Sequence, residues 1–101
     1  MDMEIKTSYD DGAAVLELGG HLNTNTASEL ENALEPVLES TNRVVLDFDE
    51  LEYFSSAGLR VLVAAQKKTM KADGTLRIVN VIDDIREVFD ATGLSDVFDV
   101  E

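Results

Sequence analysis

The spacing of hydrophobic and polar positions changes along the chain, and it predicts where strands and helices form. Near the N-terminus apolar and polar residues alternate, and the alternation resumes after Asp11 and Gly12 at Ala14, Leu16 and Leu18. A period of two is that of a strand with one buried side, and Asp-Gly is a strong signal for a tight turn between antiparallel strands. The first part of the chain is therefore predicted to be a β-hairpin.

The apolar residues of the next segment recur every three or four positions: Ala27, Leu30, Leu34 and Val37. This spacing predicts a helix from about Thr26 to Glu39, with Thr26 and Glu29 as a capping box. Pro36 lies inside that helix, where its ring removes a backbone hydrogen bond. We expect either a kink there or a restart of the helix with Pro36 in its first turn.

The second half of the chain repeats the change from strand to helix. An unbroken apolar run, Val44-Val45-Leu46 followed by Phe48, predicts a strand buried on both faces, as in a parallel sheet. A second helix is predicted between Phe54 and Gly74, with a serine pair ahead of it and Asp73-Gly74 closing it. Its expected core face consists of Leu59, Leu62, Val63, Gln66 and Met70.

A third strand is expected at Leu76, Ile78 and Val79, and a third helix opens at Asp83 and Asp84 and stops at Gly93. The apolar tail from Leu94 to Val100 is expected to add an edge strand or a docking segment. The predicted order is β-β-α-β-α-β-α plus the tail, which is typical of a single α/β domain over residues 1–101.

Composition narrows the possible functions. Of 101 residues, 8 are Lys or Arg and 21 are Asp or Glu, which gives a net charge of −13, and cysteine is absent. A nucleic-acid or anionic-membrane partner needs clustered basic residues, so neither is expected as a direct partner. The chain shows no signal peptide and no apolar run near the ~20 residues that span a membrane, so a cytoplasmic setting is expected. Disulfides and thiolate metal sites are excluded.

The run Ser55-Ser56-Ala57-Gly58 stands where a strand is expected to feed a helix. Helix N-termini offer unpaired N–H groups and a positive dipole end. Ser56 is expected to cap the helix with its hydroxyl facing outward, and a phosphate on it would add about −1.5 to −2 charges. An ordinary N-cap serine is the alternative interpretation, and the residue types by themselves do not identify a switch.

Other candidate sites have weaker support. His21 is the single histidine, so any Ser-His catalytic arrangement must use it, but a nucleophile elbow would need glycine where Phe54 stands. The acids at 47, 49, 50 and 52 could suggest a magnesium or phospho-aspartate site, yet a late lysine is missing. We interpret them as a solvated loop that contributes to partner specificity. The lysines at 67, 68 and 71 form either a solvated helix face or a basic cluster that offsets nearby acids or meets an acidic patch on the partner, and the sequence does not decide between them.

Four motifs together resemble the successive signatures of the STAS domain family, with its anti-sigma factor antagonists as the nearest group. They are Leu18-Gly19-Gly20-His21-Leu22-Asn23-Thr24-Asn25-Thr26-Ala27, Arg43-Val44-Val45-Leu46-Asp47-Phe48, Phe54-Ser55-Ser56-Ala57-Gly58-Leu59 and Val88-Phe89-Asp90-Ala91-Thr92-Gly93-Leu94. The resemblance implies a mixed sheet with an N-terminal hairpin and helices packed on it. It also implies that no cofactor or metal is needed and that the protein is not an enzyme.

The resemblance further implies a mode of action. An unphosphorylated antagonist binds an anti-sigma factor that is also a serine kinase and frees the sigma factor, phosphorylation reverses this, and a phosphatase restores binding. The family stretch Asp-Ser-Ser-Gly-Leu places the phosphoacceptor on Ser56, while Ser55 replaces the acid and competes as acceptor. The implied partner-binding residues are His21, Asn23, Thr24, Ser55, Ser56, Ala57, Gly58 and Arg60.

The competing hypothesis within the same fold is a constitutive STAS adaptor or scaffold subunit. Such a subunit would belong to a stress-signalling assembly or a lipid-transport complex, and it would carry no phosphoswitch. Ser56 would then be a helix cap and nothing more. Phosphorylation of Ser56 by an ATP-dependent kinase distinguishes the two hypotheses.

Overall fold

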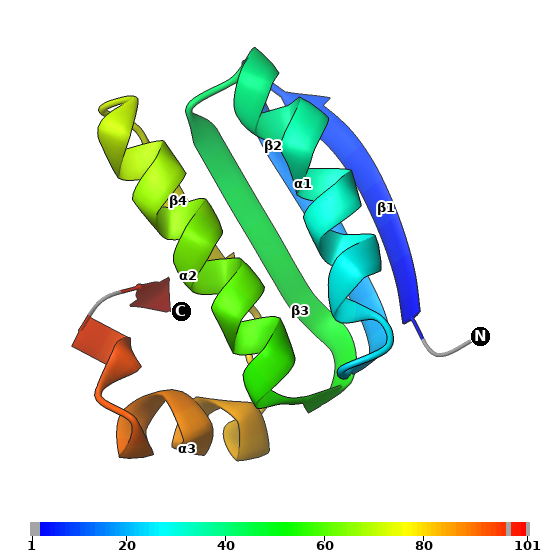
Figure 1. The fold of residues 1–101 in the computed structure, drawn as a ribbon. Helices are drawn as coiled ribbons and strands as arrows, with labels where there is room; N and C mark the ends of the chain where they lie inside the picture. The colour runs from blue at the N-terminus through cyan, green and yellow to red at the C-terminus, as the bar shows by residue number, and fades with distance from the viewer. Residues whose placement is uncertain (1–2, 97, 101) are drawn as a thin grey trace.

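The computed structural model describes residues 3–96 and 98–100, in which five strands form one sheet. The strands are β1 (Met3–Asp10), β2 (Ala13–Leu22), β3 (Arg43–Phe54), β4 (Thr75–Val79) and β5 (Asp99–Val100). Their order across the sheet is their order in the chain. β1 and β2 are antiparallel, and every other neighbouring pair is parallel (Figure 1). The predicted hairpin and edge strand are confirmed.

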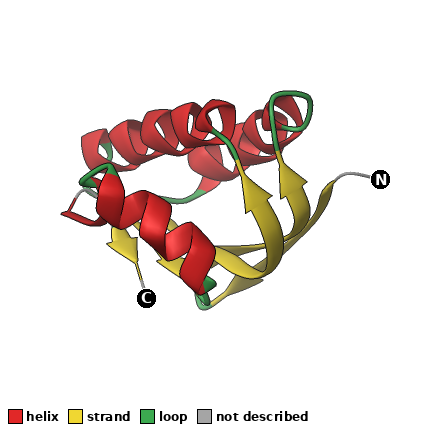
Figure 2. Ribbon diagram, turned by 90° about the horizontal axis from the view of Figure 1, so that it is seen from below, coloured by secondary structure: helices red, strands yellow, loops and turns green. Residues whose placement is uncertain are grey.

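The helices are α1 (Ala27–Ser40), α2 (Ser56–Lys71) and α3 (Asp83–Ala91), followed by the short 3₁₀ helix η1 (Leu94–Asp96). α1 and α2 lie side by side on one face of the sheet and run in the same direction (Figures 1 and 2). α3 lies at the end of the sheet where α2 begins. The predicted order of strands and helices is confirmed.

The centre of the core is a row of residues that face the helices across three neighbouring strands. Leu16 of β2 pairs with Leu46 of β3, which pairs with Ile78 of β4, and all three are fully buried. Leu30 of α1 and Leu62 of α2 are fully buried in the same cluster. Burial of each such side chain contributes roughly 1.5–3 kcal/mol to folding, so this row fixes the two helices on the sheet.

Aromatic residues attach α3 and the tail to the sheet. The ring centroid of Phe54, at the end of β3, lies 5.4 Å from that of Phe89 in α3, and the Phe89 and Phe98 centroids are 5.8 Å apart. Phe89 and Phe98 are both buried. The third helix is therefore held directly beside the point where β3 leads into α2.

Strand β3 is longer than its hydrophobic run predicts. The strand continues to Phe54, and two register shifts against β2 give it two extra residues between Asp47 and Tyr53. The interpretation of the acids at 47, 49, 50 and 52 as a loop is wrong. Bulges of this kind allow charged residues to lie within a strand by turning them toward solvent.

Burial differs from the prediction at three points. Because α1 and α2 cover only one face, Val45 is half-buried rather than enclosed on both sides. On α2 the buried residues are Gly58, Val61, Leu62, Ala65 and Thr69, and Met70 is 64% exposed. The inward face combines the fully buried Leu62 with small residues, which permit close approach to the sheet where they stand. Helix α1 continues through Pro36, so the predicted restart is wrong.

Candidate functional site

The start of α2 follows β3 with a single intervening residue, Ser55. Ser55 has the extended backbone of a cap residue, and its hydroxyl oxygen accepts a hydrogen bond from the backbone N–H of Gly58 at 3.5 Å. Its carbonyl accepts the first helical bond, from Leu59 at 3.1 Å. Ser55 is thus the cap, and the prediction that Ser56 caps the helix is wrong. The helix begins one residue earlier than that prediction requires, which places Ser56 inside its first turn.

Ser56 is exposed, and its hydroxyl makes no hydrogen bond within the described part of the chain. It therefore presents a nucleophilic oxygen at the positive end of a 16-residue helix. A negatively charged group attached there would be favoured by the dipole and by the first N–H groups of the helix.

Gly58 explains how closely the start of α2 approaches the end of β2. A Cβ atom on Gly58 would lie 2.4 Å from Cγ of Leu22, a side chain that is fully buried. The backbone N–H of Ser55 donates to the carbonyl of Leu22 at 2.9 Å. The end of β2 and the start of α2 are therefore joined by one hydrogen bond and one tight packing contact.

The loop from β2 to α1 is closed by its own side chains. The Asn23 side-chain oxygen accepts hydrogen bonds from the N–H groups of Asn25 and Thr26, at 2.9 and 3.0 Å. The Thr26 hydroxyl donates to the carbonyl of His21 at 2.7 Å and accepts from the N–H of Asn23 at 2.8 Å.

Thr26 is 2% exposed, and its side chain makes no cap bond to α1. The capping box with Glu29 is therefore wrong. The Thr26 hydroxyl is used within the loop, and Asn23 organises the turn that leads into the helix.

His21 is exposed and lies in β2, one residue before the end of the strand. Its ring packs edge-on against Tyr53 of β3, with centroids 6.1 Å apart and ring planes at 74°. No hydrogen bond joins His21 to either serine in the described residues, so the structure does not assemble a Ser-His pair. Tyr53 is not among the predicted site residues, because only its strand pairing with His21 brings it to this site.

Three further predicted partner-binding residues are Thr24, Ala57 and Arg60, and they differ in exposure and position. Thr24 is exposed in the loop, and Ala57 is half-buried beside Gly58. Arg60 is exposed on α2 four positions after Ser56. Residues four apart lie on the same helix face, so Arg60 is the nearest cation along α2 to the Ser56 hydroxyl.

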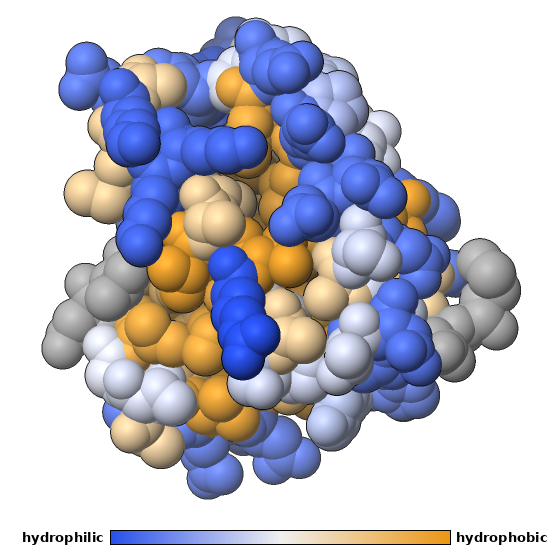
Figure 3. All heavy atoms as spheres, in the orientation of Figure 1, coloured by the Kyte–Doolittle hydropathy of each residue, from blue (hydrophilic) through white to orange (hydrophobic). Residues whose placement is uncertain are grey.

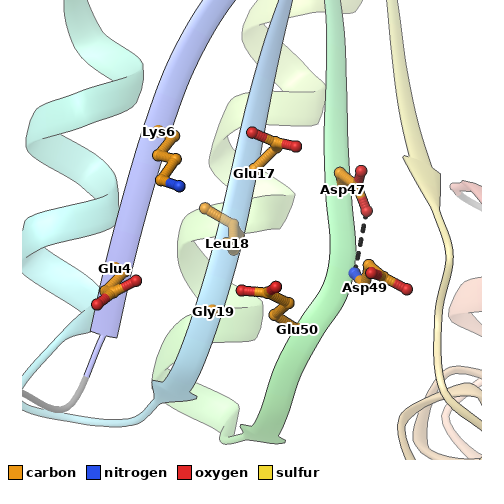
Figure 4. A pocket seen from close by; sticks show the side chains of 8 residues that line it. All are labelled: Glu4, Lys6, Glu17, Leu18, Gly19, Asp47, Asp49 and Glu50. Atoms are coloured by element: carbon orange, nitrogen blue, oxygen red, sulfur yellow. Dashed lines mark hydrogen bonds between the residues drawn. The ribbon is translucent and has the colours of Figure 1, made fainter.

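Three acids of β3, Asp47, Asp49 and Glu50, lie on the open face of the sheet (Figure 4). The Asp47 carboxylate accepts from the backbone N–H of Asp49 and from the side-chain amide of Asn80, both at 3.0 Å. The three acids lie in one cleft with residues of β1 and β2. The cleft is lined by Glu4, Lys6, Glu17, Leu18, Gly19, Asp47, Asp49 and Glu50. Within residues 3–96 and 98–100, no three His, Asp or Glu side chains are grouped so that they could hold a metal ion.

A helix that crosses a membrane must be both long and apolar. In the described ranges, no helix combines the length and the apolar character that crossing a membrane requires.

Fold and site together define a class of protein: an α/β domain with two helices on one face of a mixed sheet and an exposed serine at the start of the second helix. The STAS domain model matches residues 4–101, so this chain belongs to the STAS domain family. The resemblance of its motifs to that family is confirmed.

Relatives agree with this assignment. The anti-sigma-B factor antagonist of Staphylococcus aureus is 32% identical, over 99% of this chain and 94% of that protein. The crystal structure of an anti-sigma factor antagonist from Mycobacterium paratuberculosis is 28% identical, with a TM-score of 0.88 over 97% of this chain and 84% of that one. The phosphorylated form of Bacillus SpoIIAA shares the fold, with a TM-score of 0.77 and 15% identity over 97% of this chain and 91% of SpoIIAA.

Proposed function

We propose that this chain is an anti-sigma factor antagonist whose binding is switched by phosphorylation of Ser56. The unmodified form binds an anti-sigma factor that is also a serine kinase, and the sigma factor is released. Phosphorylation by that kinase ends binding, and a phosphatase restores it. The chain acts by binding and catalyses no reaction. Similarity to the anti-sigma factor antagonists of Staphylococcus aureus and Mycobacterium paratuberculosis supports the antagonist role.

The observation that carries the switch is the environment of Ser56. Its hydroxyl is exposed and unbonded at a helix N-terminus, while Ser55 performs the capping. A phosphate there would add about −1.5 to −2 charges, and the helix dipole would favour it by about 0.3–1 kcal/mol. The domain can therefore carry the phosphate without unfolding, and the change is one of surface charge.

The proposed partner surface is grouped around Ser56. It comprises His21, Asn23 and Thr24 from the end of β2 and its loop, the cap residue Ser55, and Ser56, Ala57, Gly58 and Arg60 from α2. The 2.9 Å bond between Ser55 and Leu22 supports this grouping, because it holds the two segments together. Arg60, one turn after Ser56, can pair with the phosphate and compete with contacts to the partner.

The test combines site mapping with a matched pair of variants. Each anti-sigma factor kinase of the same genome is incubated with the chain and ATP, and the phosphorylated residue is found by mass spectrometry. Binding is then measured for Ser56→Ala, Ser56→Asp and the control Ser28→Asp. Ser28 is exposed in the first turn of α1, so this control adds the same charge at another helix N-terminus.

The proposal expects phosphate on Ser56 and binding that Ser56→Ala retains, Ser56→Asp weakens and Ser28→Asp leaves unchanged. Phosphate on Ser55 alone would move the switch by one residue. Absence of phosphate with every kinase, together with unaltered binding of Ser56→Asp, would overturn the switch in favour of a constitutive adaptor.

A further inference from the structure

An apolar groove runs between α1 and α2 on the side that faces away from the sheet. Its floor is formed by Leu34 of α1 and by Val61 and Ala65 of α2, which are 2%, 9% and 3% exposed. Leu38 is half-buried at one wall, and Ala64 is exposed at the other. In Figure 3 apolar side chains form a band between hydrophilic flanks over these two helices.

The groove exists because of residue sizes. Where α1 presents Leu34 and Leu38, α2 presents Ala64 and Ala65. Side chains of neighbouring helices normally fill the space between the axes, and two alanines in succession leave that space open at the surface. Nothing in the described part of the chain covers it.

The two rims of the groove carry opposite charges. Glu31 and Glu35 stand on the α1 side, and Lys68 stands on the α2 side. All three are exposed, and none of them forms an ion pair or a side-chain hydrogen bond within the described residues. The opposite charges across the groove are therefore available to an external partner.

We propose that the partner in this groove is a second copy of this chain. α1 and α2 run in the same direction, so a two-fold axis along the groove sets α1 of one copy over α2 of the other. Glu31 and Glu35 of each copy then face Lys68 of its partner, and the half-buried Leu38 of one copy meets the exposed Ala64 of the other. A two-fold interface requires such a self-complementary surface.

Charge complementarity favours a second copy over a simple charged segment. A basic segment would meet Lys68, and an acidic one would meet Glu31 and Glu35. A suitable partner needs an acidic and a basic ridge side by side over an apolar strip, which is what this chain presents. The net charge of −13 opposes association over long range, but the Debye length at physiological salt is only about 8 Å, so contacts at the groove dominate.

The groove is separate from the proposed switch. On α2 it begins at Val61, five residues beyond Ser56, which is about 7.5 Å along the helix. A dimer formed here leaves the N-terminus of α2 open, so its existence does not depend on phosphorylation.

The test measures self-association of the purified full chain by sedimentation velocity over a wide concentration range. The variants are Glu35→Lys, Lys68→Glu and the double exchange, which restores the wild-type net charge. Glu87→Lys on α3 and Lys6→Glu on β1 are exposed controls with the same charge changes. Circular dichroism establishes that each variant is folded.

We expect the wild-type chain to dimerise, each groove variant to weaken the dimer at least about tenfold, the double exchange to restore it, and the controls to have little effect. A monomer at every concentration would overturn the proposal, as would a dimer that both groove variants leave intact. A monomeric chain whose complex with an anti-sigma factor is weakened by the groove variants would also overturn it and assign the groove to that partner.

Discussion

Helices α1 and α2 both follow a parallel strand at the same end of the sheet, yet their N-termini are built differently. Before α1, Asn23 and Thr26 use their side chains in four hydrogen bonds of 2.7 to 3.0 Å, and Thr26 is buried. Before α2, the single cap bond of Ser55 measures 3.5 Å, and Ser56 is exposed with an unbonded hydroxyl. One start is closed by its own polar groups, and the other leaves a hydroxyl free.

The difference shows that the same strand-to-helix connection can serve either as a rigid structural element, at α1, or as a modifiable site, at α2. Polar groups that bond one another in a buried loop hold the backbone rigid, and altering one leaves its partner unsatisfied. A free hydroxyl can be modified at little structural cost. We therefore expect substitutions to lower the free energy of unfolding strongly at the start of α1 and at the contact between Gly58 and Leu22. Substitutions of Ser55 and Ser56 should lower it only slightly.

The largest effect is expected for Gly58→Ala, because the new methyl group would lie 2.4 Å from Cγ of Leu22. We expect a loss of about 2–3 kcal/mol in the free energy of unfolding from overpacking. Urea denaturation measures it. The double variant Gly58→Ala/Leu22→Ala should lose less free energy of unfolding than the sum of the losses in the two single variants. Strict additivity of the two losses would contradict the contact.

Thr26→Val tests the closed start of α1. The substitution keeps the shape of the side chain but leaves the carbonyl of His21 and the N–H of Asn23 without their partner. We expect a loss of about 1–2 kcal/mol in unfolding free energy. Thr24→Val, at an exposed neighbouring threonine, is the control and should change stability by less than about 0.5 kcal/mol. Equal effects at both positions would mean that the buried network contributes nothing.

Ser55→Ala removes the cap of α2. Because the cap bond is long, we expect a loss of only about 0.5–1 kcal/mol, at the low end of measured cap deletions. Thermal unfolding followed by circular dichroism is the measurement. A rescue by Ser55→Asp, which also caps well, would support the role, whereas a loss as large as that of Thr26→Val would show that the two starts are equally closed.

Ser56→Ala is expected to have the smallest effect on stability, within about 0.5 kcal/mol of wild type, because the hydroxyl is exposed and unbonded. The same denaturation experiment measures it beside Ser55→Ala. If Ser56→Ala lost more free energy of unfolding than Ser55→Ala, Ser56 would be the capping residue, and the N-termini of α1 and α2 would no longer differ in the way described.

The order of elements could be predicted from the sequence because each change of hydrophobic period is strong and each turn has its usual residues. Asp11 and Gly12 adopt positive φ angles in the hairpin turn, as Asp-Gly predicts. The buried face of α2 could not be derived in the same way. Leu59, Leu62 and Met70 fit a helical period, but the approach of Gly58 to Leu22 determines which face turns inward, and that contact joins distant parts of the chain.

The candidate site could be located from sequence but not resolved in detail. The serine pair is at the helix start as predicted, yet which serine caps depends on where β3 ends. Neither the bulges that lengthen β3 nor the pairing of His21 with Tyr53 has a local signal, because both depend on register against β2. Thr26 has the spacing of a capping box, but burial directs its hydroxyl to the loop.

The agreement between strand order in the sheet and strand order in the chain has a consequence for assembly. As the chain leaves the ribosome, each new strand can pair with the one completed just before it, so no gap has to be kept open for a later segment. Pairing each strand with its neighbour in the chain keeps the contact order lower than a shuffled strand order would, and a lower contact order favours faster folding. The growing edge is exposed only until the next strand arrives, and this shortens the time during which it could pair with another chain.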